Sequence, residues 1–447
     1  MGLQTINPHA AGIDVGSEQL FVAVVEGPVK VFDTFTESLH AVREHLLAAG
    51  VTSVAMEATG VYWLPLYEVL DAAGLEVCVV NGAHVKSLPG RKSDMEDCQW
   101  LAKLHSCGLL RTGFVPPATI RRLRDYQRLR QDHVRMGSAH IQHMQKALDR
   151  MNIKIHEVLS DLTGASGMRM VRAIVKGVRD PRVLLELCDA QVLRSKRERL
   201  LKALRGNWRS EHLFALHQAL EGWEFYQRQM EACDREIALV LQEMAALAPP
   251  PAHGEPTSSG DAAGTSSKRI HHNAPRIDDL KKLLVRITGG HDLGALPALT
   301  DYTVLQLIAE IGTDMGRWPT VKHFTAWLGL APSTRRSGKR RRREKRFRGR
   351  AAQILCVAAR VLSRSKYLAL GGFYRRLRAT RGPQVANVAA ARKLAVLVYN
   401  TLRHGLHHVE QGLQHYEAVY RQQCLKRLQR NARDLGLTLI PLSTQNA

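Results

Sequence analysis

Four carboxylates near the start of the chain have the types and spacing of a metal site. Asp14 lies in GIDVGS and Glu57 lies in VAMEATG, each at the end of a strand-like apolar run. Asp94 and Asp97 are three residues apart in SDMED at the start of a predicted helix, so they share one helix face. Converging acids repel each other unless a cation compensates them, and oxygen ligands suit Mg²⁺ or Mn²⁺. The pattern predicts a metal site for phosphodiester chemistry.

Each acid also has a purely structural interpretation. Asp94 follows Ser93 at a helix start, where the helix dipole favours acids, so this pair on its own fits helix capping. Asp14 and Glu57 are harder to explain in this way, because both are flanked by apolar residues and a buried carboxylate without a partner is costly. The four acids taken together favour the metal site.

The elements that must position these acids are short strands and helices. Three consecutive runs rich in β-branched or aromatic residues predict a meander of strands at 11–17, 20–26 and 29–35. Helices are expected at 38–49 and 62–73, and further strands at 52–58 and 75–81. Strands followed by strand–helix alternation predict a mixed α/β sheet with helices on its faces. Ligands of such sheets bind at strand ends, where Asp14 and Glu57 fall.

Composition agrees with a phosphate-rich partner. The 447 residues include 64 Lys and Arg against 41 Asp and Glu, which gives a net charge of +23. No apolar run is long enough to predict a membrane span, and the first residues lack the features of a secretory signal. Seven scattered cysteines without a Cys-x-x-Cys pair indicate reduced thiols in a cytoplasmic protein.

Two apolar ladders in the middle of the chain have the alternating three and four spacing of coiled-coil seams. The helices could pack together within one chain or join two protomers. Gln227 and Asp234 interrupt the second seam, where polar residues can fix the register. A basic segment around Arg197 lies between the ladders and is either solvated or faces RNA. The first ladder is Ile141, Met144, Leu148, Met151, Ile155, Val158 and Leu162, and the second includes Leu213, Leu216, Leu220, Trp223, Met230, Ile237, Leu241 and Met244.

The last third of the chain is predicted to be helical after a linker. Residues 249–268 are rich in Pro, Gly and Ser and predict a loose tether. Residues 296–312 suit a helical hairpin, in which Pro-Ala-Leu-Thr occupies the turn. Further on, His404, His407 and His408 have no acid or cysteine at a helpful spacing, so we expect them to be surface residues.

A strongly basic run contains a second candidate for chemistry. Residues 335–350 hold eleven Lys or Arg and one acid, and Ser337 lies within them. Such runs are usually solvated or grip phosphates without specificity. A serine hydroxyl needs activation, for which neighbouring guanidinium groups could stabilise developing charge. Ser333 is the nearest competing hydroxyl. The basic residues expected to bind nucleic acid are Arg335, Arg336, Lys339, Arg340, Arg341 and Arg342.

The order of these motifs resembles a known family. GIDVGS, EATGVYW and the K-S-D-x-x-D stretch are similar to the DEDD transposases of the insertion-sequence-110 family, also called bridge-RNA-guided recombinases, whose first domain has a RuvC-like RNase H fold. The resemblance implies catalysis by the four acids and by Ser337, the serine that follows the GL-x-P stretch. It also implies Mg²⁺ (or Mn²⁺), donor and target double-stranded DNA, a structured noncoding guide RNA, and a homo-oligomer built as a dimer of dimers.

The expected organisation is α/β plus α. It comprises a RuvC-like DEDD domain at 1–112, a helical coiled-coil domain at 113–248, a flexible linker at 249–276 and a helical C-terminal transposase domain with the serine at 277–447. The expected function is DNA cleavage, strand exchange and religation through a phosphoserine intermediate, in the prokaryotic cytoplasm at the nucleoid. Two alternatives stay open: a metal-dependent DNA junction endonuclease that uses only the acids and water, and a noncatalytic nucleic-acid-binding protein.

Overall fold

The computed structural model describes residues 4–57, 60–80, 82, 94–249, 273–332, 335–337, 340–342, 348–364 and 368–438. Most of the predicted linker therefore lies outside the described residues. The chain divides into two compact units, Met1–Pro116 and Pro117–Ala447, and each is described by itself. Among the described residues, no helix combines the length and apolar character needed to cross a membrane.

The first unit is built on a five-stranded mixed sheet with the order β3-β2-β1-β4-β5. Strands β1, β2 and β3 form the predicted antiparallel meander, and β4 and β5 continue the sheet in parallel with β1. This confirms the mixed α/β fold expected from the sequence. The elements are β1 (Ala10–Val15), β2 (Gln19–Val24), β3 (Val29–Asp33), α1 (Thr36–Ala48), β4 (Ser53–Glu57), α2 (Trp63–Ala72), β5 (Glu76–Val80) and α4 (Asp94–Ser106).

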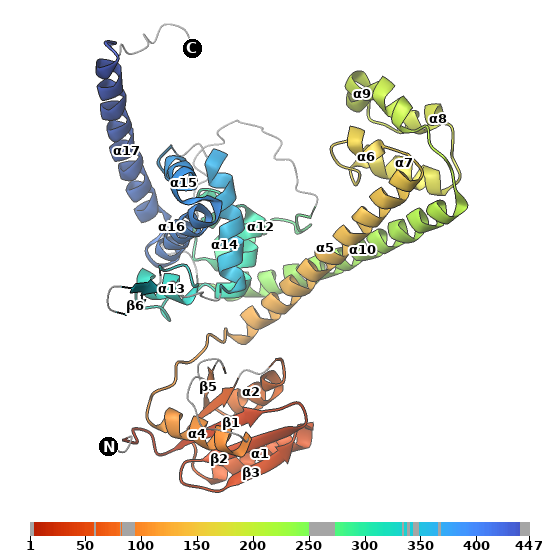
Figure 1. Ribbon diagram of the computed structural model, residues 1–447. Coiled ribbons are helices and arrows are strands. Elements are labelled where there is room, and N and C mark those ends of the chain that lie inside the picture. The colour runs from red at the N-terminus through yellow and green to blue at the C-terminus, as the bar shows by residue number, and fades with distance from the viewer. Residues whose placement is uncertain are drawn as a thin grey trace. The chain divides into compact units, whose positions relative to one another are not determined.

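Helices cover both faces of this sheet (Figure 1). Alternate residues of β1 and β4, such as Ile13 and Met56, are fully buried in one apolar cluster with Leu46 of α1 and Leu66 of α2. On the opposite face, Leu101 of α4 packs in a second cluster with side chains of β4 and β5. Because strand side chains alternate between faces, the residues between those buried against α1 and α2 point toward α4.

The second unit is almost entirely helical in its described part. Its first half is an arm of two long helices, α5 (Ala118–Arg150) and α10 (Ser210–Leu247), which run antiparallel and pack against each other (Figure 1). This is the in-chain alternative for the two predicted seams. Four shorter helices at the end of the arm share an apolar core with α5 and α10. They are α6 (Ile155–Val158), α7 (Ala165–Val175), α8 (Pro181–Glu186) and α9 (Ala190–Ala203).

The first predicted ladder is wrong as one continuous helix. Helix α5 ends at Arg150, and Asn152 adopts a left-handed conformation with φ of 55°. The ladder residues Met151, Ile155 and Leu162 are nevertheless buried in the core at the end of the arm. The apolar spacing thus identified residues that are buried on both sides of a turn. A compact core can bury the same residue types without a continuous helical seam.

A buried ion pair crosses the arm at one of the polar seam positions. The guanidinium of Arg130, which is 2% exposed, donates to Asp234 of α10, with Nε 2.5 Å from Oδ1. Arg130 also donates to the carbonyl of Asn273 and to the hydroxyl of Tyr302, and the amide of Arg276 donates to Asp234. The pair therefore ties α5 and α10 to the chain that follows the linker.

The C-terminal half of the second unit is a bundle of helices around α16. The exposed positions of His404, His407 and His408 agree with the sequence expectation. The elements are α11 (Leu280–Ile287), η1 (Leu293–Ala295), α12 (Asp301–Ile311), α13 (Val321–Trp327), β6 (Arg335–Ser337), β7 (Arg340–Arg342), α14 (Arg350–Val361), η2 (Leu362–Arg364), α15 (Leu368–Arg381), α16 (Pro383–His404) and α17 (Leu406–Asp434).

Candidate catalytic centre

Asp14 and Glu57 lie at the same level of two neighbouring parallel strands. Ile13 of β1 is paired with Met56 of β4, so the next residue of each strand, Asp14 and Glu57, follows at the same edge of the sheet. Adjacent strands are about 4.8 Å apart. Both acids alternate with residues buried against α1 and α2, so both lie on the sheet face that α4 covers.

Helix α4 reaches this face because Gly12 has no side chain. A Cβ atom at position 12 would lie 2.3 Å from the amide nitrogen of Ala102 and 2.4 Å from the carbonyl oxygen of Cys98. Any larger residue would push α4 away from β1. The close contact brings the first turns of α4, which carry Asp94 and Asp97, toward the strand that carries Asp14.

The pKa of the Cys98 thiol reflects the negative charge between β1 and α4. Cys98 is fully buried between α4 and the sheet. Burial, together with the negative charges of Asp14 and Asp97, raises the pKa of the Cys98 thiol to about 11. Both carboxylates therefore lie near enough to one buried atom to act on it electrostatically.

Glu57 is buried, with 7% of its surface exposed. Gly82, just beyond β5, leaves the space that its carboxylate occupies, because a Cβ atom there would lie 1.9 Å from Oε1 of Glu57. Glu57 shares its sheet face with Asp14, and the helix that covers this face, α4, carries Asp97. The three carboxylates offer oxygen donors only. Such a set fits a hard divalent cation such as Mg²⁺ or Mn²⁺.

The carboxylate oxygens of these acids are not all close enough together to bind one metal ion. The ligand oxygens of Asp14, Glu57 and Asp97 do not all lie within 4.8 Å of one another, and the side chain of Asp94 lies outside the described part. Of the described residues, only Asp149, His156 and Glu157 in the arm meet that distance. Lys154 already neutralises Asp149, with Nζ 2.5 Å from Oδ1, so this second group is an ion-pair cluster.

Ser337 lies in a two-stranded antiparallel ribbon. Its backbone is paired with Arg340, while Arg335 and Arg336 are paired with Arg342 and Arg341. The ribbon therefore places the candidate nucleophile opposite an arginine position. The side chains of these residues, and all of Ser333 and Lys339, lie outside the described part of the chain.

The segment before the ribbon is held by aromatic and arginine contacts. The rings of Trp318 and Phe324 meet edge to face, with 5.0 Å between their centroids. The hydroxyl of Tyr399 on α16 donates to the carbonyl of Trp318, and the same carbonyl accepts from Arg403. Helix α13, which leads into the ribbon, is thereby fixed to α16.

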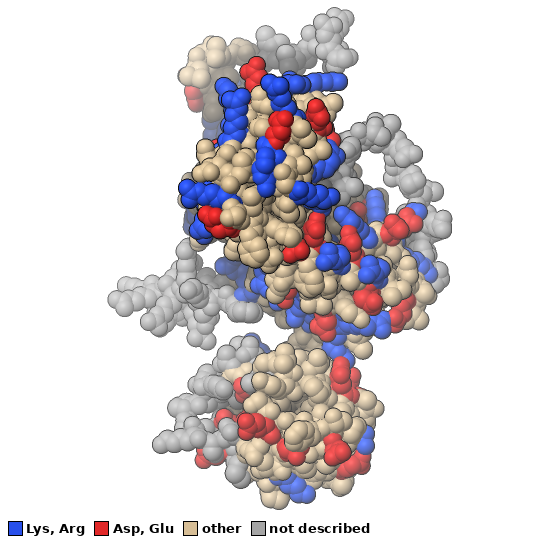
Figure 2. All heavy atoms as spheres, turned by 90° about the vertical axis from the view of Figure 1, so that its right-hand side faces the viewer, with Lys and Arg blue, Asp and Glu red and all other residues tan. Residues whose placement is uncertain are grey.

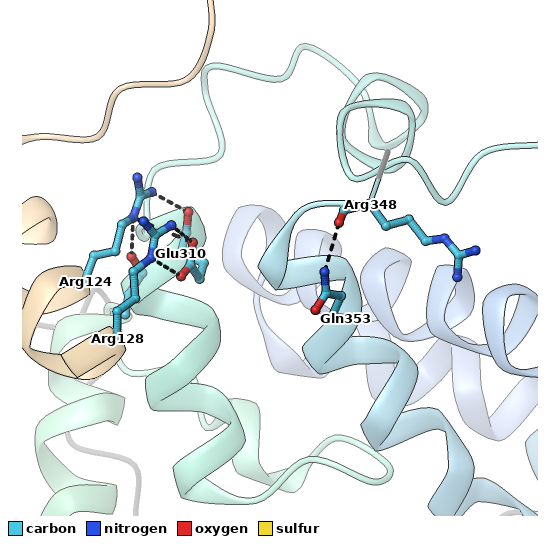
Figure 3. A network of polar contacts seen from close by, with 6 residues as sticks. Arg124, Arg128, Glu310, Arg348 and Gln353 are labelled. Atoms are coloured by element: carbon cyan, nitrogen blue, oxygen red, sulfur yellow. Dashed lines mark hydrogen bonds and ion pairs between the residues drawn. The ribbon is translucent and has the colours of Figure 1, made fainter. Parts of the chain in front are cut away.

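Helix α12 is fixed to the base of the arm (Figure 3). Both nitrogens of the Arg128 fork donate to the two oxygens of Glu310 at 2.9 Å. Arg124 donates to the carbonyls of Ala309 and Glu310, which satisfies acceptors at the C-terminal end of α12. After the ribbon in the sequence, the side-chain amide of Gln353 donates to the carbonyl of Arg348 (Figure 3). The contacts of Arg124 and Arg128 with α12 could not be predicted from the sequence, because the partners are more than 180 positions apart in the chain.

The two units carry opposite net charge. Residues 1–116 contain 7 Lys and Arg against 13 Asp and Glu, whereas residues 117–447 contain 57 against 28. The acids are thus in a domain that repels phosphate, and the whole positive excess belongs to the second unit. The positive charge that could attract a polyanion is therefore concentrated in the second unit.

Both candidate regions, the acids of the first unit and the basic ribbon of the second, match models of known protein families. Residues 11–153 match the family model of the IS110-type DEDD transposase, and residues 291–375 match a second model, described as a transposase of the IS116/IS110/IS902 family. The chain belongs to the IS110 family of transposases. No curated protein matches its sequence.

The two matches cover both candidate regions of this IS110-family transposase. The first contains Asp14, Glu57, Asp94 and Asp97, and the second contains Ser337. The chain is therefore an enzyme of DNA transposition that binds DNA, and its DEDD domain belongs to a type that depends on divalent metal.

Proposed function

We propose that Asp14, Glu57, Asp94 and Asp97 hold Mg²⁺, or Mn²⁺, and that Ser337 is the nucleophile of a recombinase reaction. What supports the acids is the shared sheet face of Asp14 and Glu57 and the approach of α4 through Gly12. What supports the serine is its place in a basic ribbon inside the second family match. The main support is that one chain contains both the four acids, in the first family match, and Ser337, in the second.

The proposed chemistry exchanges one phosphoester for another. The Ser337 hydroxyl loses its proton to a base, its Oγ bonds to a backbone phosphorus, and one phosphorus–oxygen bond of the DNA breaks to release a deoxyribose hydroxyl. A hydroxyl of another strand then attacks the phosphoserine and restores Ser337. Each step replaces one ester by another, so religation needs no ATP.

The protein groups have separate roles in this scheme. A divalent cation, when bound, would neutralise phosphate charge and favour in-line displacement. Glu57, buried beside Gly82, would give that cation a rigid ligand. Six basic residues would hold the scissile backbone and stabilise charge that develops on phosphate. They are Arg335, Arg336, Lys339, Arg340, Arg341 and Arg342.

The choice of sequence and the assembly follow from the same proposal. A structured noncoding RNA would select donor and target DNA by base pairing, while the protein grips backbones. The protomers would assemble as a dimer of dimers, in which Ser337 of one protomer completes the acid site of another. Sequencing of nucleic acid that copurifies with the protein tests the RNA: one defined noncoding species supports guidance, and its absence contradicts it.

Cleavage of end-labelled donor DNA, analysed on denaturing gels with and without protease, tests the nucleophile. Ser337→Ala should abolish both cleavage and the protein-linked product, with a loss of about a thousandfold or more. Ser333→Ala is the matched control in the same segment and should keep both. Asp14→Asn should also abolish both, because the acids and the serine act in one step.

A metal-dependent junction endonuclease predicts a different pattern. It would lose cleavage in Asp14→Asn, keep cleavage in Ser337→Ala, and show no protein-linked DNA in any variant. A noncatalytic binding protein would bind DNA equally in all three variants and cleave in none. Either pattern would contradict the proposed recombinase.

A further inference from the structure

Positive charge is concentrated in the second half of the C-terminal helix α17. Residues 418–434 contain five Lys or Arg and one acid, Asp434 at the last position, whereas the first half of the helix contains Glu410 and Glu417 and no Lys or Arg. All five basic residues are exposed, and within the described residues none of them forms an ion pair. They are Arg421, Lys426, Arg427, Arg430 and Arg433.

The first half of α17 is fixed to the bundle. The carboxylate of Glu417 accepts the amide of Ala369 at 2.8 and 2.9 Å. Lys393 of α16 lies over the ring of Tyr416, with Nζ 4.7 Å from the centroid. Gly372 of α15 also permits close approach, because a Cβ atom there would lie 2.1 Å from the hydroxyl of Tyr420. These contacts aim the rest of the helix, which projects from the bundle (Figure 1).

Helix stability explains only part of this charge. Cations in the last turn interact favourably with the helix dipole, which accounts for Arg433 and in part for Arg430. The effect fades beyond the last turn, so it does not account for Arg421, Lys426 or Arg427. Helix α9 at the end of the arm has a similar balance of five Lys or Arg against Glu198, and acidic side chains lie among the basic ones on the face shown in Figure 2.

The basic side chains have the spacing of a backbone contact. Lys426, Arg430 and Arg433 stand at i, i+4 and i+7, so they share one helix face. With a rise of 1.5 Å per residue they cover about 10 Å, a length that reaches several phosphates of a duplex. Exposed leucines at 425, 428 and 435 lie on the other face. Three leucines bury far less than the roughly 1,200 Å² of a stable protein interface.

We propose that the second half of α17 docks on the phosphate backbone of duplex DNA, in addition to the ribbon that carries Ser337 and independently of it. Charge complementarity is the basis of this choice. The second half of α17 carries five basic side chains against one acid, Asp434 at its last position, and it extends from a first half that is fixed to the bundle, in an enzyme that binds DNA. The contact grips DNA without reading its sequence, because phosphates are the same at every step.

The test is DNA binding by the full-length protein in EDTA, with a labelled 30-base-pair duplex across a series of salt concentrations. The variant is Lys426→Gln/Arg430→Gln/Arg433→Gln, since Gln preserves helix propensity. The matched control, Arg194→Gln/Arg197→Gln/Arg199→Gln, removes the same charge from exposed positions of α9. Binding in EDTA requires neither metal nor Ser337, so a failure here is separate from a failure of the proposed chemistry.

Loss of three phosphate contacts should reduce the slope of log K against log salt by about 2.7, from about 0.9 per contact. Between 50 and 200 mM salt, the wild-type affinity should then fall about 40-fold more than that of the α17 variant. The α9 control should keep the wild-type slope. Equal slopes for the α17 variant and the wild type would overturn the proposal, as would equal changes in both variants. A reduced salt slope for duplex RNA, with an unchanged slope for duplex DNA, would show that the helix binds RNA. This result would also overturn the proposal.

Discussion

Gly12 of β1 and Ala102 of α4 are in direct backbone contact, since a Cβ atom at position 12 would lie 2.3 Å from the amide nitrogen of Ala102. This contact sets the distance between the strand that ends near Asp14 and the helix that carries Asp97. The separation of two candidate ligands thus depends on a residue that has no functional group of its own.

Gly12→Ala should move α4 and separate the acids. The added methyl group meets backbone atoms, which cannot swing aside, so we expect the free energy of unfolding to fall by about 1–3 kcal/mol. Cleavage activity should fall by more than the loss of folded protein accounts for, because the spacing of the metal ligands changes. Gly27→Ala is the matched control, since its Cβ atom would lie 3.5 Å from its nearest neighbour. Equal, small effects in both variants, measured by urea unfolding and DNA cleavage, would contradict this role of Gly12.

Gly82→Ala should displace the carboxylate of Glu57 and leave the fold largely intact. The new methyl group would meet the end of a side chain, 1.9 Å from Oε1, and a side chain can rotate away. We therefore expect weaker Mn²⁺ binding by calorimetry, with little change in the urea midpoint. Unchanged Mn²⁺ affinity would show that the position of Glu57 does not matter for metal.

Breaking the Arg130–Asp234 pair should destabilise the second unit strongly. Arg130→Met leaves the Asp234 carboxylate buried without its main partner, at a cost of about 3–5 kcal/mol. Arg130→Met/Asp234→Leu should recover part of that loss. The control is Arg135→Met, whose partner Asp132 is at the surface, with an expected loss under about 1 kcal/mol. A double variant no more stable than Arg130→Met in urea unfolding would contradict the account.

The raised pKa of Cys98 gives a prediction for pH. The pKa of the folded thiol is about 11, while an unfolded thiol has its ordinary pKa of 9.0. Above pH 9 the unfolded state therefore binds fewer protons, and stability should fall as pH rises from 9 toward 11. Cys98→Ala should reduce this dependence relative to wild type in urea unfolding at pH 8, 9 and 10. An identical pH dependence in both proteins would contradict the burial of this thiol beside Asp14 and Asp97.

The local pattern of the sequence predicted much of the first unit. The ends of apolar runs placed Asp14 and Glu57, and alternation placed the strands, because these features depend on neighbouring residues. The Arg130–Asp234 pair joins residues 104 positions apart, and no local pattern marks such partners. The first ladder failed at Asn152 for a related reason: an apolar spacing records which residues are buried, and a turn within a core preserves that spacing.

The most direct measurement of the central claim is the site of covalent attachment. Donor DNA that carries a nick next to the cleavage site would trap the intermediate, and nuclease digestion with chymotryptic mapping by mass spectrometry would locate the remaining nucleotide. We expect a nucleotide on Ser337 that forms with Mg²⁺ and is absent in Asp14→Asn. Attachment at Ser333 or elsewhere, or efficient cleavage without any attached nucleotide, would contradict the central claim.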